Sequence, residues 1–140
     1  MSKGFIVDAG PLVAFFSSMD QHHDWATDQF RALQPPLLTC EAVLSEACFL
    51  LSRHPKAIDL LFRYVERKVV QLRFSLAAEI EPVTRLMRRY ADQPMSLADA
   101  CLVRMSETID NAVVVTTDGD FHVYRRHGRK VIPAISPEPA

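Results

Sequence analysis

The feature that most constrains the fold is a series of short apolar runs, the first of which ends at Asp8. Residues 4–7 are apolar or small at every position rather than at alternate positions. A strand of this kind needs cover on both faces, as the strands of parallel sheets have. Comparable runs, which we expect to be the other strands, occur at residues 37–39, 69–72, 112–116 and 130–132.

Helical patterns fill the segments between these runs. After Pro55, apolar residues at positions 58, 61, 62 and 65 follow the spacing of one helix face. Ser96 and Asp99 form a capping-box pattern at the start of another helix. Further helices are expected at residues 12–16, from the cap Asp20 to Leu33, from Thr39 or Cys40 to Leu51, and at 80–91.

Alternating strands and helices predict a three-layer α/β/α sandwich with a five-stranded, mostly parallel sheet. We expect one domain over residues 1–135 and a frayed tail at 136–140, because 140 residues suit a single domain.

Composition excludes several classes of protein. Sixteen Lys and Arg against 17 Asp and Glu give a net charge of −1, which rules out an overall basic coat but not a local basic patch. Cys40, Cys48 and Cys101 lack zinc-site spacing and are interpreted as core residues of a reduced, cytoplasmic protein. The apolar start is interrupted by Asp8 and is too short to cross a membrane, so neither a signal peptide nor a membrane segment is expected.

Four carboxylates fall where the predicted strands end. Asp8 closes the first strand, and Asp118 stands two residues beyond the fourth. Glu46 lies early in the helix after the second strand, and Asp99 lies in the first turn of the helix that leads into the fourth. Parallel strands share a carboxyl edge, so these side chains are expected to converge there.

Converging carboxylates repel one another, and sites that keep them together usually hold a divalent cation. Oxygen ligands favour Mg²⁺ or Mn²⁺, and such ions support phosphodiester hydrolysis. Taken singly, each acid has an ordinary explanation: a turn residue for Asp8, a solvated helix residue for Glu46, a first-turn acid for Asp99 and a helix cap for Asp118. The specific signal is the set of four at one edge.

Four segments in order resemble the PIN domain family, and in size the VapC-type toxins of toxin–antitoxin pairs. They are residues 6–12 (IVDAGPL), 39–46 (TCEAVLSE), 90–100 (YADQPMSLADA) and 115–121 (VTTDGDF). The resemblance implies a metal-dependent ribonuclease with a five-stranded parallel sheet, usually dimeric. Its metal-binding acids would be Asp8, Glu46, Asp99 and Asp118, with Thr116 as a nearby polar support. Asp120 could share or replace the role of Asp118.

We therefore expect an endoribonuclease that depends on Mg²⁺ or Mn²⁺. Asp8, Asp99 and Glu46 would hold a first ion, and Asp118 would hold a second ion or position the attacking water. A structure-specific DNA nuclease, a receiver-like signalling domain and a binding protein without turnover are the alternatives. RNA phosphates would be attracted by basic side chains, for which the candidates are Arg85, Arg88, Arg89, Arg125, Arg126, Arg129 and Lys130.

The helices after the first strand carry more large apolar side chains than one sheet face can cover. We expect some of them to form an exposed patch that serves a homodimer and a small antitoxin protein. An antitoxin segment could place an arginine over the acids. The large apolar residues from which this patch would form are Trp25, Phe30, Phe49, Leu50, Ile58, Leu61, Phe62 and Val65.

Overall fold

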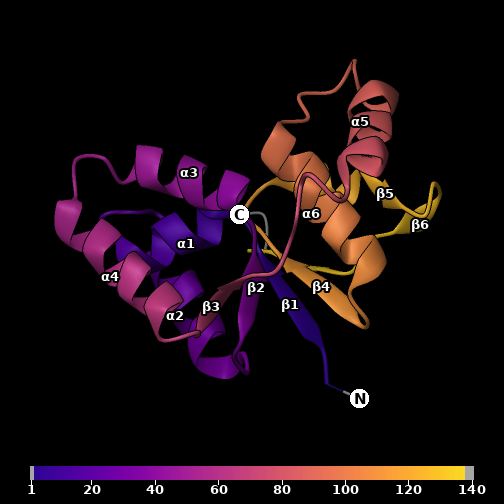
Figure 1. Ribbon diagram of the computed structural model, residues 1–140. Coiled ribbons are helices and arrows are strands. Elements are labelled where there is room, and N and C mark those ends of the chain that lie inside the picture. The colour runs from indigo at the N-terminus through magenta and orange to yellow at the C-terminus, as the bar shows by residue number, and fades with distance from the viewer. Residues whose placement is uncertain (1, 138–140) are drawn as a thin grey trace.

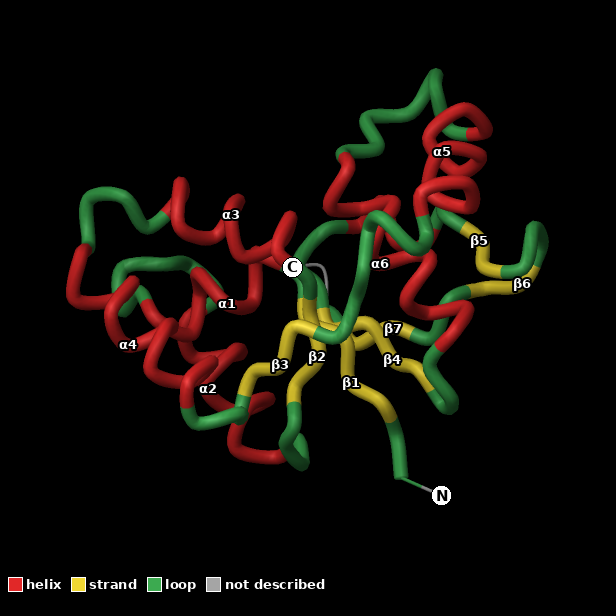
Figure 2. Tube along the Cα trace, viewed as in Figure 1, coloured by secondary structure: helices red, strands yellow, loops and turns green. Residues whose placement is uncertain are grey.

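A five-stranded sheet forms the centre of the protein in a computed structural model that describes residues 2–137. All four strand pairings are parallel, in the order β3-β2-β1-β4-β7. Figure 2 shows these strands gathered between two groups of helices. The strands are β1 (Gly4–Val7), β2 (Leu37–Thr39), β3 (Val70–Leu72), β4 (Ala112–Val115) and β7 (Ala134–Ile135).

Helices cover both faces of the sheet, which confirms the predicted three-layer sandwich (Figure 1). One group is α1 (Ala9–Phe16), α2 (His23–Ala32), α3 (Glu41–Leu50) and α4 (Pro55–Glu66). The other group is α5 (Ile80–Arg89) and α6 (Leu97–Thr108). A 3₁₀ turn at Gly119–His122 then leads into an antiparallel hairpin of β5 (Arg125–Arg126) and β6 (Lys130–Val131).

The central strands are buried because helices pack on both of their faces. Ile6 in β1, Val114 in β4 and Leu102 in α6 are fully buried. This explains why the strands are apolar at consecutive positions rather than at alternate ones. Within residues 2–137, no helix combines the length and the apolar character needed to cross a membrane.

Two local expectations about helix starts are confirmed. Ser96 accepts a hydrogen bond from the Asp99 amide, and the Asp99 side chain accepts one from the Ser96 amide, so the capping box is complete. Pro82 lies in the first turn of α5, where its missing amide proton leaves no helical hydrogen bond unmade.

The position of the fifth strand is a correction. Residues 130–132 were expected to join the sheet, but β6 pairs with β5 in the hairpin, and β7 completes the sheet. The backbone of β7 is held by ladder bonds, including Thr116 N–H to the Ile135 carbonyl at 3.0 Å. A two-residue strand offers too short a pattern to be recognised in the sequence.

Helix α2 also begins later than expected. Asp20 was expected to cap it, but its side chain accepts a hydrogen bond from the His22 amide in the preceding turn, and the helix starts at His23. Helix α1 begins earlier than expected, at Ala9. Residues 138–140 of the expected frayed tail lie outside the described residues.

Two neighbouring leucines of α4 test the packing of this helix. Leu61 is fully buried and Leu60 is 41% exposed. Leu61→Ala is expected to lower the free energy of unfolding by about 2–5 kcal/mol, because it leaves a cavity in the core. Leu60→Ala is the matched control and should cost about 0.5 kcal/mol or less. Denaturant unfolding measures both, and equal losses would contradict the described packing.

Candidate metal centre

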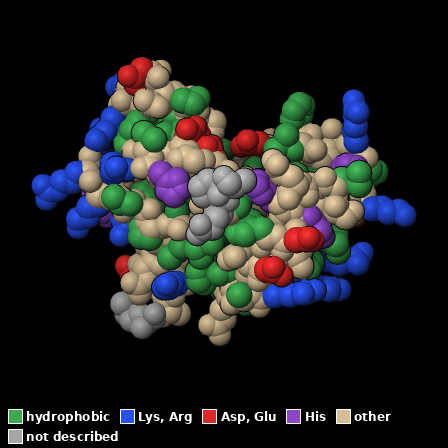
Figure 3. All heavy atoms as spheres, turned by 180° about the vertical axis from the view of Figure 1, so that it is seen from behind, with side chains coloured by type: hydrophobic (Ala, Val, Ile, Leu, Met, Phe, Trp, Pro, Cys, Tyr) green, Lys and Arg blue, Asp and Glu red, His purple; other side chains and the backbone are tan. Residues whose placement is uncertain are grey.

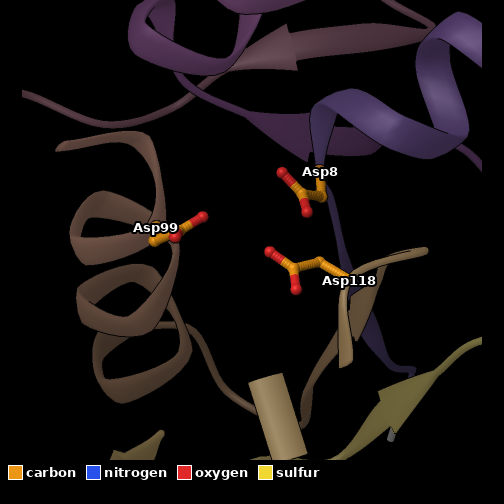
Figure 4. Close-up of side chains that lie close together, drawn as sticks. All are labelled: Asp8, Asp99 and Asp118. Atoms are coloured by element: carbon orange, nitrogen blue, oxygen red, sulfur yellow. The ribbon is translucent and has the colours of Figure 1, made fainter. Parts of the chain in front are cut away.

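Three aspartates meet at the carboxyl edge of the sheet. Asp8, Asp99 and Asp118 each offer one carboxylate oxygen, and these three oxygens lie within 4.8 Å of one another. Figure 4 shows the carboxylates turned toward a common point from three separate segments. The parallel sheet brings the first and the third together, because β1 and β4 are neighbours with Val7 beside Val115.

Asp8 is fixed by two hydrogen bonds. It directly follows β1 and caps α1, where its Oδ1 accepts a bond from the Ala9 amide at 2.7 Å. Its Oδ2 accepts a bond from the Thr116 hydroxyl at 2.8 Å. Asp8 is only 6% exposed, so its orientation is set by these partners rather than by solvent.

Thr116 joins two of the three acids. This fully buried residue donates its hydroxyl proton to Asp8, and its Oγ1 accepts a bond from the Asp118 amide at 2.9 Å. Asp118 in turn accepts a bond from the Asp120 amide at 2.9 Å and so caps the 3₁₀ turn. The expected supporting role of Thr116 therefore has a clear geometric basis.

Asp99 reaches the site from the first turn of α6. The capping box with Ser96 fixes its backbone, and its Oδ2 also accepts a bond from the Tyr124 hydroxyl at 3.2 Å. Tyr124 is fully buried against the rings of Phe121 and Tyr90, both in edge-on contact. Tyr124 was not identified from the sequence, where its signal is the aromatic pair at positions 121 and 124.

The other two candidate acids lie outside the cluster of three. Glu46 is exposed on α3, at the rim of the acid cluster, and its charge contributes to the raised pKa of Asp8. Glu46 was expected to hold a first ion with Asp8 and Asp99, and the acid that the structure groups with these two is Asp118. Asp120 contributes its amide to the Asp118 side chain, and its own carboxylate is not part of the cluster.

The candidate substrate-binding arginines lie on a different part of the surface. Arg85, Arg88 and Arg89 are exposed on α5, whereas Arg125 and Arg126 are half-buried in the hairpin.

The start of α1 lies very close to the loop after β4. A Cβ atom at Gly10 would overlap the Thr117 hydroxyl, so only glycine fits between the two segments. This contact holds the start of α1, which carries Asp8, against the loop that carries Asp118.

Burial and mutual repulsion raise the pKa values of these acids. Desolvation is the main cause at Asp8, where the charges of Asp99 and Glu46 add to it and the pKa rises to about 6. Desolvation also raises the pKa of Asp99, with a contribution from the Asp118 charge. At Glu46 the pKa is raised by desolvation and then by Asp99 and Asp118.

These donors suit a hard divalent cation. All of them are carboxylate oxygens, and neither Asp8 nor Asp99 forms a salt bridge with a basic side chain in residues 2–137. A cation would neutralise the charges whose repulsion raises the pKa values. The residues therefore fit Mg²⁺ or Mn²⁺ better than zinc, which prefers nitrogen and sulfur ligands.

The pKa of Asp8 leads to a prediction about stability without metal. A carboxyl whose pKa is higher in the folded state than in the unfolded chain destabilises the fold as it ionises. In chelator, ionisation of Asp8 between about pH 4 and pH 6 should cost the wild type at most about 3 kcal/mol. Asp8→Asn should therefore melt no lower than the wild type at pH 7, and this relative advantage should disappear near pH 4.

Thermal unfolding with chelator across this pH range measures the effect. Asp110→Asn, at an exposed position outside the cluster, is the matched control and should follow the wild type at every pH. If Asp8→Asn melted well below the wild type at pH 7, the two hydrogen bonds of Asp8 would outweigh its charge. Asp8 would then be a structural residue.

The chain shares its fold and family with known proteins. It is similar to the crystal structure of Mycobacterium tuberculosis VapC20, a sarcin-ricin loop cleaving toxin, with a TM-score of 0.73 and 22% identity over 86% of this chain and 94% of that one. No curated protein matches the chain. A family model described as the PIN domain matches residues 5–127, a span that runs from within β1 to the turn of the β5–β6 hairpin. With that match and three acids at the carboxyl edge of its sheet, the chain belongs to the PIN domain family.

Proposed function

We propose that this protein is an endoribonuclease that depends on Mg²⁺ or Mn²⁺ and acts as the toxin of a toxin–antitoxin pair. The observation that carries the nuclease proposal is the cluster of Asp8, Asp99 and Asp118 within 4.8 Å in a member of the PIN domain family. The structural likeness to VapC20, a sarcin-ricin loop cleaving toxin, supports RNA as the substrate.

In this proposal the three aspartates hold the cation, and the neighbouring residues keep them in place. Once bound, the cation would activate water and stabilise the negative charge that develops on the phosphate. Thr116 keeps Asp8 and the Asp118 backbone in register, and Tyr124 orients Asp99. In this proposal Glu46, which is exposed to solvent and feels the charges of Asp99 and Asp118, would accept a proton from water or bind a second ion.

The alternatives from the sequence fare differently. The family match argues against a receiver-like domain, and Lys130 lies in the hairpin rather than after a strand of the main sheet. A DNA nuclease would use the same acids, so only the choice of substrate separates it from the proposal. A binding protein without turnover would leave the three aspartates with no chemical task.

Substitution of the acids tests the proposal. Asp8→Asn, Asp99→Asn and Asp118→Asn should each lower RNA cleavage with Mg²⁺ by about 100-fold or more, since loss of even an outer-shell partner costs about 10–100-fold. Asp120→Asn should cost less, because its carboxylate lies outside the cluster. Initial rates on structured RNA, with and without chelator, measure these effects.

Parallel assays on RNA and DNA of the same sequence identify the substrate. Full activity of Asp99→Asn, or cleavage that persists in chelator, would refute the metal-dependent mechanism. A larger loss in Asp120→Asn than in Asp118→Asn would transfer the proposed metal-binding role of Asp118 to Asp120. Preferential cleavage of the DNA would favour the alternative nuclease.

The partner surface that we propose lies on α3 and α4. Phe49 is 77% exposed, Leu50 is 52% exposed and Phe62 is 44% exposed. Of the other expected patch residues, Leu61 is fully buried and Trp25, Phe30, Ile58 and Val65 are partly buried against the core. Large apolar side chains exposed on two successive helices favour a contact with a second copy or with an antitoxin segment.

The mass in solution tests the homodimer. The wild type should elute as a dimer, and Phe49→Glu should shift it toward the monomer by placing a charge in the contact. Val131→Glu, at a 63% exposed position in the hairpin, is the control and should remain dimeric. Light scattering coupled to size exclusion measures the mass. A monomeric wild type at all concentrations would remove the dimer from the proposal.

A further inference from the structure

Two segments of the chain concentrate positive charge. Residues 85–89 and 125–130 contain seven of the 16 Lys and Arg residues of the protein and no Asp or Glu. The net charge of the whole chain is −1, so this concentration is local rather than general. The two segments are about 40 residues apart in the sequence, where they appear as unrelated clusters.

The fold joins these segments into one surface. A cleft of about 380 Å³ lies between α5 and the turn of the β5–β6 hairpin. Arg85 and Arg89 line it from α5, and His127 and Gly128 line it from the turn. A Cβ atom at Gly128 would lie 3.4 Å from Nη1 of Arg89, so the two segments are in contact. In Figure 3, which shows the molecule from behind, Lys and Arg side chains gather on the left, the side on which α5 and the hairpin lie.

The turn of the hairpin is held in place by α6. The His127 amide donates a hydrogen bond to the Glu107 side chain at 2.7 Å, and Glu107 also accepts a bond from Arg104 at 3.2 Å. Arg104 in addition pairs with Glu79 at 2.7 Å. Glu79 and Glu107 are thus occupied with Arg104 and with the backbone. Glu81 lies beside Arg85 and Arg88 on α5, but no salt bridge within residues 2–137 joins it to either of them.

Two of the seven basic side chains bind the protein itself. Nη1 of Arg125 donates to the carbonyls of His122, Val123 and Tyr124, and Nη1 of Arg126 lies 3.5 Å from the Ser106 carbonyl. These two side chains therefore stabilise the hairpin. The remaining five are exposed, and no salt bridge within residues 2–137 includes any of them: Arg85, Arg88, Arg89, Arg129 and Lys130.

Ordered contacts connect this surface to the acid cluster. The guanidinium of Arg89 lies 5.4 Å from the centre of the Tyr90 ring, and the Tyr90 hydroxyl accepts a bond from the Arg125 amide at 2.9 Å. The ring of Tyr90 packs on that of Tyr124, whose hydroxyl binds Asp99. The basic surface and the cluster are therefore separated by two buried tyrosines rather than by a mobile loop.

We propose that α5 and the β5–β6 hairpin form the phosphate-binding surface that holds an RNA strand on one side of the cleaved bond. This inference rests on the proposed function and adds to it the part of the protein that binds RNA beyond the cleavage site. Unneutralised cations on a rigid surface attract a polyanion and position it without reading its sequence. The free side chains for this task are the five exposed ones.

A charge-matched pair of triple variants tests this surface. The first variant replaces three arginines of the proposed surface with glutamine: Arg85→Gln, Arg88→Gln and Arg129→Gln. The control replaces the exposed cations Lys3, Arg31 and Arg73, which lie outside both this surface and the proposed partner surface, with glutamine (Lys3→Gln, Arg31→Gln and Arg73→Gln), so both variants lose three positive charges. Both are made in Asp8→Asn protein without divalent ions, so that fluorescence anisotropy of a labelled RNA measures binding alone.

The salt dependence of binding is the decisive measurement. Each phosphate contact contributes about 0.7 to the slope of log K against log salt for a single strand, so the first variant should lose a slope of about 2 and bind at least about 10-fold more weakly at low salt. The control should keep the slope of the parent protein. Melting temperatures equal to that of the parent protein establish that both variants are folded.

The outcomes separate this inference from the proposed function. If both triple variants bind RNA equally, this surface is not the binding surface, even where the wild type cleaves RNA with Mg²⁺. If the first variant alone loses binding but the wild type cleaves no RNA, the surface stands and the nuclease proposal fails. A slope that falls equally for RNA and for single-stranded DNA supports a phosphate-binding surface, and the cleavage assay then identifies the substrate.

Discussion

The repulsion among three carboxylates is the constraint on which the rest of this structure depends. Asp8, Asp99 and Asp118 lie within 4.8 Å of one another, and Asp8 is almost fully buried. Such an arrangement destabilises a protein that has no cation to neutralise it. The protein nevertheless supports each acid with hydrogen bonds from Ala9, Ser96, Thr116, Asp120 or Tyr124. Support of this kind is consistent with a site kept for binding a metal ion rather than for stability.

The topology explains why these three acids meet. Central strands β1 and β4 are parallel neighbours, so the residues that follow them emerge side by side. Helix α6 leads back into β4, and its first turn therefore lies at the same edge and delivers Asp99. Glu46 is carried by α3 on the other side of this edge, which places it at the rim. The order of the strands thus determines which acids lie together and which one faces solvent.

The sequence predicted the parts of this fold that rest on long or strongly apolar patterns. The first four strands and the capping box at Ser96 follow from such patterns, and the family resemblance is confirmed by the match over residues 5–127. The last strand was misplaced, because β7 has two residues and follows Pro133. Helix starts were harder to predict: Asp20 was expected to cap α2, but its side chain accepts a hydrogen bond from the His22 amide in the preceding turn. Local sequence does not distinguish these two uses of the same side chain.

The candidate site was predictable only as far as it depends on strand ends. Four acids near one edge could be derived from parallel topology, but the choice of the three that form the cluster depends on side-chain directions. Tyr124 was missed because its hydroxyl reaches Asp99 across 25 residues of sequence. The engagement of Arg125 with three carbonyls was equally hidden, since a basic residue in a loop is usually solvated. Contacts between distant segments fix both of these roles.

Helix α6 links the two halves of the proposed function. Its first turn carries Asp99, and its last turns carry Arg104 and Glu107, which hold the hairpin turn at His127. One rigid helix therefore sets the spacing between the acid cluster and the basic surface. An RNA strand bound through its phosphates on α5 and the hairpin would present a fixed position to the acids, whatever its sequence. Any preference for particular bases would then have to come from residues around the acid cluster itself.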